Sequence, residues 1–254
     1  MTHFFDTVET IPEGMGFDLF SISHLCWLAA LGVFILISIL HYRKLAPDKR
    51  DKMRKFYAAS LLINELIKNL CLLACGTFLS KYLPFHLCSI NIFVVALHAW
   101  KPSRAVSDYL YLVCIPASLF PLFTPTWTDL PHVNFMVWHS FTIHATLAAY
   151  PLMLTIGGDI RPKLKNIPRS LLVLFSLAPV ALAANLILGG DSNFMFLMYA
   201  EPGTPLVFFE ELMGHHLAGF FVLIPLILVI MMTPILLVDA RQKRTAKTQE
   251  RILS

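Results

Sequence analysis

Long apolar runs dominate this sequence and restrict the folds that are open to it. Seven of them approach the ~20 residues that an α-helix needs to cross a lipid bilayer. They cover about 22–42, 56–79, 83–100, 106–124, 133–156, 168–188 and 211–238. Only 14% of the residues are charged, whereas a soluble domain carries about 25%. Because backbone polar groups in lipid must pair within the protein, the runs predict an all-α bundle of seven transmembrane helices.

One transmembrane domain, residues 1–240, is predicted, followed by a basic tail at 241–254. The last run is long and contains Pro225 and Pro234, so we expect it to tilt, kink or continue past the bilayer. Residues 189–210 are too polar to span and too apolar for a free loop. They are predicted to form a re-entrant or capping element on the outer face.

The distribution of Lys and Arg sets the orientation. If the seven runs alternate across the membrane, every Lys and Arg except Lys68 and Lys81 lies in connections on one side or in the C-terminal tail. The positive-inside rule then places the N-terminus outside and the C-terminus in the cytoplasm. Residues 1–20 contain no Lys or Arg and lack the basic region of a cleavable signal peptide. We therefore expect a multi-pass protein of the cell membrane with an uncleaved first helix.

The cysteines and histidines differ in what they predict. All five cysteines lie in apolar runs, which argues against disulfides, and four are interpreted as small hydrophobic residues: Cys26, Cys71, Cys75 and Cys114. Eight of the ten histidines fall in the predicted outer half or near mid-depth, which predicts a polar cavity open to the outside. Some outer residues fit interfacial anchors instead: His3, His132, Trp127 and Trp138.

Glu65 and Lys68 are charged residues inside the second run. Their i, i+3 spacing predicts an internal ion pair, flanked by Asn64 and Asn69 as hydrogen-bonding neighbours that tie helices together. Charged side chains within a membrane span face the bundle interior, so the pair marks the inner side of this helix.

Cys88 is the cysteine singled out as chemically active. Pro84 suits a first helical turn, which puts the thiol near a helix N-terminus, where the macrodipole favours a thiolate. Asn91 follows one turn later on the same face.

The base for Cys88 must come from another helix, because His86 is two residues away and points to nearly the opposite face. His139 and His144 are the candidates, about 140° apart on their helix, and depth in the membrane slightly favours His139.

Several segments carry a family resemblance. They are Leu83-Pro84-Phe85-His86-Leu87-Cys88-Ser89, Leu122-Phe123-Thr124-Pro125, Trp138 to Ala145, and Asn193-Phe194-Met195-Phe196-Leu197 with Pro202. In these segments the chain resembles the YwaF-like integral membrane family, which includes the relatives of transmembrane protein 164. The eukaryotic relatives are regarded as cysteine-dependent acyltransferases that act on ether phospholipids. The resemblance therefore implies acyl transfer between membrane lipids through an acyl-thioester intermediate.

Roles carried over by motif make Cys88 the nucleophile and His144 its partner histidine. Supporting or alternative positions are His86, His139, Asn91, Ser89, Glu65 and Asn193. Ala145 stands where the family usually has Gly, and Gly214-His215-His216 replaces the usual start of the last span. These departures leave the acyl donor and acceptor open.

Two other classes of function compete with this interpretation. A transporter or channel with an outward-open cavity would also place Glu65 and Lys68 inside the membrane. A metal site is disfavoured because His215 and His216 are adjacent and would point in different directions on a helix. A retinal protein is disfavoured because the seventh run has no Lys to form a Schiff base. Membrane lipids are the expected partners, with no metal, cofactor or nucleic acid.

Overall fold

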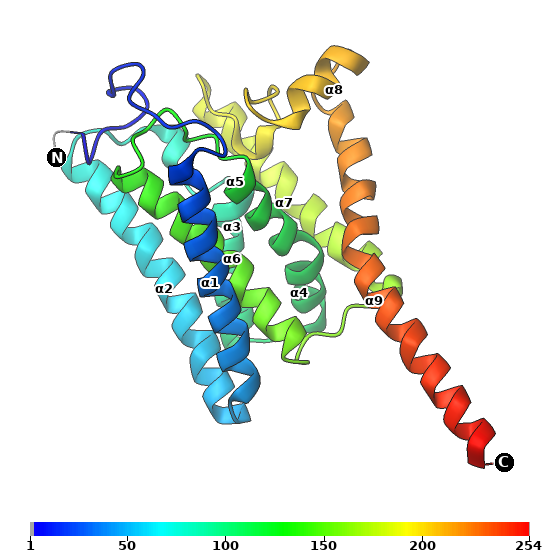
Figure 1. Cartoon of the computed structure of the whole chain (residues 1–254). Coiled ribbons are helices and arrows are strands. Elements are labelled where there is room, and N and C mark those ends of the chain that lie inside the picture. The colour runs from blue at the N-terminus through cyan, green and yellow to red at the C-terminus, as the bar shows by residue number, and fades with distance from the viewer. Residues whose placement is uncertain (1–2, 254) are drawn as a thin grey trace.

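The computed structural model describes residues 3–253, with side chains described except at 239 and 242–253. Within that part every regular element is helical (Figure 1). The α-helices are α1 (Ile22–Lys44), α2 (Pro47–Ala74), α3 (Leu87–Trp100), α4 (Arg104–Tyr109), α5 (Ile115–Phe123), α6 (Phe135–Ile156), α7 (Ile167–Leu188), α8 (Pro205–Met213) and α9 (Ala218–Leu253). Short turns of other helical types are η1 (Ser80–Tyr82), the π-helical η2 (Leu110–Cys114), η3 (Leu164–Asn166) and η4 (Phe194–Phe196).

Six stretches of the described chain are long and apolar enough to cross a membrane, which confirms a multi-pass membrane protein. They are Ile22–Lys44, Pro47–Ala74, Ser80–Trp100, Arg104–Phe123, Leu164–Leu188 and Ala218–Val238. The other predicted span, 133–156, forms α6, which is less apolar. More than half of its 22 residues are buried, so its surface is set by protein neighbours rather than by lipid. Seven crossings stay a prediction.

Several helix boundaries differ from the sequence-based expectation, and two of the differences have a clear local cause. The predicted last span, 211–238, is split because Gly214 has a φ of 77° and ends α8 in the left-handed conformation that favours glycine. The helix that follows begins only at Ala218 and runs to Leu253, well beyond the bundle (Figure 1). At the other boundary, α2 begins at Pro47 rather than near residue 56, because a proline fits its first turn and Asp51 pairs with Lys55 at 2.7 Å.

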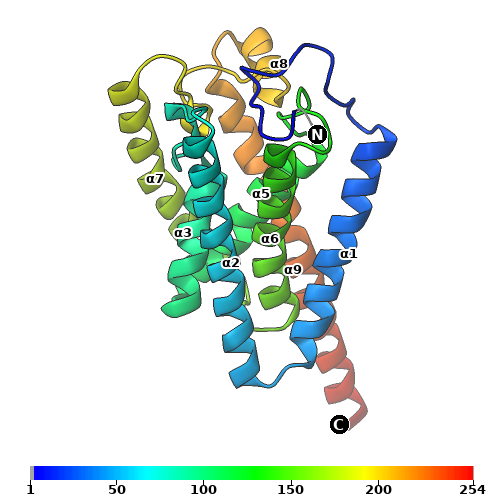
Figure 2. The same cartoon turned by 90° about the vertical axis from the view of Figure 1, so that its left-hand side faces the viewer.

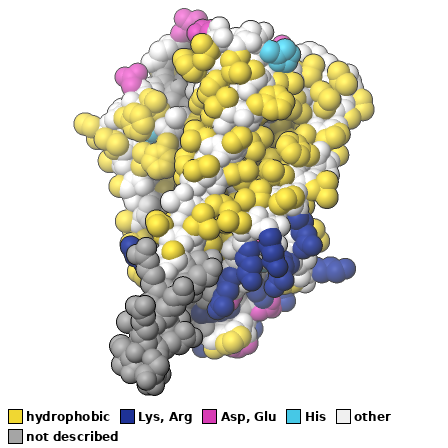
Figure 3. Space-filling model, turned by 90° about the vertical axis from the view of Figure 1, so that its right-hand side faces the viewer, with side chains coloured by type: hydrophobic (Ala, Val, Ile, Leu, Met, Phe, Trp, Pro, Cys, Tyr) yellow, Lys and Arg dark blue, Asp and Glu magenta, His cyan; other side chains and the backbone are white. Residues whose placement is uncertain are grey.

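The two ends of the bundle have different character. The N-terminal segment and α8 lie at one end, and the C-terminus lies at the other (Figure 2). Figure 3 shows Lys and Arg side chains gathered at the end near the C-terminus, below a broad apolar surface. This segregation agrees with the charge distribution that led to the predicted orientation, while the direction of insertion stays a prediction.

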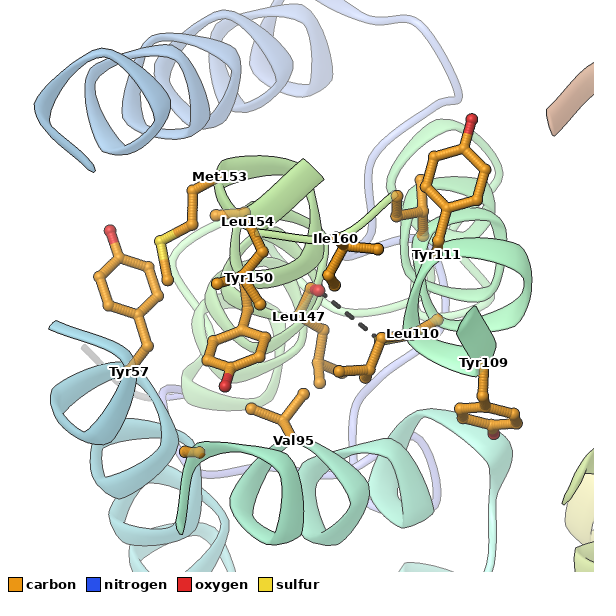
Figure 4. Packing of buried hydrophobic residues seen from close by; sticks show 14 of the residues in the cluster. Tyr57, Val95, Tyr109, Leu110, Tyr111, Leu147, Tyr150, Met153, Leu154 and Ile160 are labelled. Atoms are coloured by element: carbon orange, nitrogen blue, oxygen red, sulfur yellow. Dashed lines mark hydrogen bonds between the residues drawn. The ribbon is translucent and has the colours of Figure 1, made fainter. Parts of the chain in front are cut away.

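The central core lies between α2, α3, η2 and α6. Figure 4 shows Tyr150 and Leu147 of α6 facing Val95 of α3. The Tyr150 hydroxyl lies 2.9 Å from His98 Nδ1, and His98 Nε2 lies 3.0 Å from the Ser107 hydroxyl oxygen. The Ser107 hydroxyl itself donates to the Ser103 carbonyl, so His98 donates through Nε2 and accepts through Nδ1. This buried chain joins α3, α4 and α6 at the end opposite the candidate site.

Candidate functional site

Cys88 lies in the first turn of α3, closer to the helix N-terminus than expected. The helix begins at Leu87 rather than near residue 83, because η1 and an extended Leu83 precede it. Pro84 therefore lies before the helix and not in its first turn. The half-buried thiol packs against the central core, and the Ser89 hydroxyl and backbone N–H lie beside it. A first-turn position strengthens the interaction of a thiolate with the helix macrodipole.

The predicted ion pair between Glu65 and Lys68 is present and buried. Lys68 Nζ lies 2.6 Å from Glu65 Oε1, and both side chains are 7% exposed. Lys68 also donates to the Tyr82 carbonyl at 3.2 Å, which ties α2 to the segment before α3. Both charges lie close enough to Cys88 to interact with it electrostatically. The structure therefore brings the thiol and the ion pair into one polar cluster.

His139 joins this cluster from α6. Its Nδ1 lies 2.6 Å from Asn64 Oδ1, which only accepts, so Nδ1 carries a proton. In the neutral ring Nε2 is then unprotonated, and it lies 3.6 Å from Glu65 Oε2. The Asn64 amide also donates to Thr142 at 3.4 Å. His139 is thus an oriented, buried imidazole, and its unprotonated nitrogen faces the Glu65 carboxylate.

His144 occupies a different face of α6. Its Nδ1 donates to the Ser140 carbonyl at 2.6 Å, and its ring stacks on Trp127 with centroids 5.3 Å apart. Its Nε2 has no hydrogen-bond partner among the described residues. Trp127 is partly buried and also packs on Phe141, with ring centroids 5.4 Å apart, and its role as an interfacial anchor stays a prediction. No hydrogen bond in the described part of the chain joins Cys88 to His139 or His144.

Asn91 is fully buried and carries an unused donor. Its Oδ1 accepts from the Tyr109 hydroxyl at 2.8 Å, which fixes the amide. Its Nδ2 has no hydrogen-bond partner in the described structure. A buried amide N–H without a hydrogen-bond partner is unusual and costs folding free energy. It lies one helical turn after Cys88, as the sequence predicted, but only the structure reveals Tyr109 and the unpaired donor.

His86 and Asn193 lie around this cluster rather than within its hydrogen bonds. The His86 ring packs on Phe194 and Phe196, with centroids 5.1 and 6.1 Å away. The Asn193 side chain donates to the Tyr199 carbonyl at 3.1 Å and accepts from two backbone N–H groups of the same loop. Asn193 therefore shapes the loop between α7 and α8.

Cys88 lines neither of the two best-formed clefts in the described part of the chain. One, of about 540 Å³, lies between the N-terminal segment and the loop before α6, beside Phe17 and Asp129. The other, of about 460 Å³, lies between α2 and α6 and is called the α2/α6 cleft. The expected outward cavity at Cys88 is therefore neither of these. Among the described residues no three His, Cys, Asp or Glu side chains come together to hold a metal ion.

Comparison with known proteins identifies the family but no individual relative. No curated protein and no solved structure matches the chain. The model of the TMEM164 family matches residues 19–236, which include every helix of the cluster around Cys88. This integral membrane protein therefore belongs to the TMEM164 family.

Proposed function

We propose that this protein transfers acyl groups between membrane lipids through a thioester on Cys88. The observation that carries the proposal is the position of the thiol, in the first turn of α3 and within electrostatic range of the buried Glu65–Lys68 pair. Ionisable groups inside a membrane span are expensive and mark functional sites. The resemblance to YwaF-like proteins and to lipid acyltransferases supports the same reaction. We further propose the cell membrane as its location, with the N-terminus outside.

The reaction needs one nucleophile and one base. An imidazole Nε2 takes the thiol proton while sulfur attacks the acyl ester carbonyl, which gives a tetrahedral oxyanion. The oxyanion collapses, the ester C–O bond breaks, and the imidazolium returns the proton to the departing lipid alkoxide. A second lipid hydroxyl then attacks the thioester, with the same imidazole as base, and the acyl group leaves sulfur as Cys88 recovers its proton.

His144 and His139 are both suitable bases, because each keeps Nε2 unprotonated when neutral. The resemblance to the family motif favours His144 as the base, whereas the contact between His139 and Glu65 favours His139. We expect replacement of the true base by Ala to lower kcat by about 10²–10⁴-fold, the usual contribution of general-base catalysis. The other substitution should leave most of the activity. The rates of lipid acyl transfer by His144→Ala and His139→Ala in vesicles identify which histidine is the base. If both variants transfer acyl groups at the wild-type rate, neither imidazole is the base.

Asn91 is proposed to donate its unpaired Nδ2–H to the oxyanion. Removal of one such donor costs about 10²–10³-fold in kcat. Asn91→Leu alone leaves the buried Tyr109 hydroxyl without a partner, so the Asn91→Leu/Tyr109→Phe double variant is the cleaner test, since replacing both partners is close to neutral for stability. We expect this double variant to fold and lose kcat, whereas Tyr109→Phe alone loses much less. Equal kcat in the double variant and the wild type would exclude this role.

A transporter remains the alternative, because buried Glu65 and Lys68 would also suit a substrate pathway. The two functions respond differently to Cys88. Acyl transfer between phospholipids in vesicles, measured with purified wild type and Cys88→Ala, is the direct test. Activity that depends on Cys88 supports an enzyme. If Cys88→Ala transfers acyl groups as fast as the wild type, the proposal fails.

A further inference from the structure

The α2/α6 cleft has an apolar mouth and a polar floor. Ile63 and Ile67 of α2 and Trp138 of α6 line it, and these side chains are 55%, 46% and 51% exposed. Phe4 also lines the cleft, and its carbonyl accepts a hydrogen bond from the Phe135 N–H at 2.7 Å. Phe4 therefore lies at the start of α6 and marks the N-terminal end of the cleft.

The floor is formed by Asn64, His139 and Thr142. His139 is only 8% exposed and Asn64 and Thr142 are partly buried, so these polar groups lie deeper than the exposed Ile63, Ile67 and Trp138. The Asn64 amide has two N–H groups, and its one hydrogen bond through nitrogen is long, at 3.4 Å to Thr142. A donor is therefore available at the floor for a carbonyl oxygen.

The surroundings of the mouth decide what kind of molecule fits. Ile63 and Ile67 lie on a helix that is long and apolar enough to cross the membrane, so acyl chains rather than water surround them there. A molecule that fills an apolar mouth and satisfies a polar floor needs a hydrocarbon chain attached to a hydrogen-bond acceptor, and the ester carbonyl of a glycerolipid is such an acceptor. The volume of about 460 Å³ lies within the range of small-molecule sites.

We infer that the α2/α6 cleft binds one acyl chain of a membrane glycerolipid, with the ester carbonyl at the Asn64 amide. His139 connects this floor to Glu65 at 3.6 Å, and the Glu65 carboxylate is within electrostatic range of Cys88. The cleft is thus a lateral entry from the bilayer to the polar cluster. The assignment of the ester as the reacting group rests on the proposed function, but binding at the cleft does not require turnover.

Photolabelling of the full chain tests this binding without catalysis. The protein carries Cys88→Ala and is placed in vesicles of diether phosphatidylcholine with a trace of diester phosphatidylcholine bearing a diazirine on one acyl chain. We expect labels to concentrate on peptides that span residues 60–67 and 135–142. Ile63→Trp and Ile67→Trp should each lower this labelling at least about fivefold, because an added indole fills the space of the chain. The matched control is Ile187→Trp on α7, where the native side chain is 83% exposed and outside the cleft.

The ester is tested by competition in the same Cys88→Ala protein without a tryptophan. Unlabelled diester phosphatidylcholine should reduce cleft labelling several-fold more than an equal addition of the diether lipid. Equal competition, or labels spread evenly over α7 and the cleft helices, overturns the inference. Cleft labelling in Cys88→Ala, combined with no acyl transfer by the wild-type protein, would instead refute the proposed function and leave the cleft assignment intact.

Discussion

Replacement of Cys88 by Ala should lower lipid acyl transfer by at least about 10³-fold, because loss of a covalent nucleophile removes the thioester route itself. The variant should fold normally, since the side chain is half-buried and loses only its sulfur atom. Measurement in vesicles with matched amounts of protein separates a loss of turnover from a loss of expression.

Cys114 provides the matched control for this prediction. It is fully buried, and its thiol lies 3.6 Å from the Leu147 carbonyl. Cys114→Ala removes the same group from the core against which Cys88 packs, and we expect it to retain most of the activity. Equal losses in the two variants would indicate general damage to the core and contradict a nucleophilic role for Cys88.

Lys68→Met should destabilise the protein by about 3–5 kcal/mol, because it leaves the buried Glu65 carboxylate without its counter-ion. The Glu65→Gln/Lys68→Met double variant removes both charges and should recover most of that loss. Chemical or thermal unfolding in a fixed detergent measures both changes.

The ion pair between Lys81 and Glu9 is a natural comparison for the buried pair. Burial alone would raise the pKa of Glu9, but hydrogen bonds from Lys81 and Thr7 lower it to about 2. Both partners are about one-third exposed, so Lys81→Met should cost no more than about 1 kcal/mol. A cost for Lys68→Met as small as that for Lys81→Met would show that water reaches Glu65 and that the cluster is not enclosed.

The helices could be predicted from the sequence where contact with lipid requires apolar side chains. Runs such as 22–42 and 168–188 match α1 and α7 within a few residues, because apolar residues begin and end there. Hydropathy marks the part of a helix that lies in the membrane rather than the helix itself, so it missed the polar first turns of α2. It also could not locate the break at Gly214, which depends on a backbone conformation.

The candidate site was predictable where partners are close in the chain. The Glu65–Lys68 pair follows from helical spacing, as does the position of Asn91 one turn after Cys88. Contacts between helices were not predictable, which is why the Asn64–His139 hydrogen bond and the Tyr109–Asn91 hydrogen bond were missed. The stacking of His144 on Trp127 is also a contact between distant segments and was missed. From the sequence, a tryptophan in a loop was interpreted as a membrane anchor.

The acyl-enzyme itself offers the most direct test of the account. Purified protein is incubated with a phospholipid that carries a labelled acyl chain, quenched in acid and digested for mass spectrometry. We predict one acyl group on the peptide that contains Cys88, removed by neutral hydroxylamine as a thioester is, and absent from Cys88→Ala. Acyl transfer at the wild-type rate with no thioester at Cys88 under these conditions would contradict the central claim.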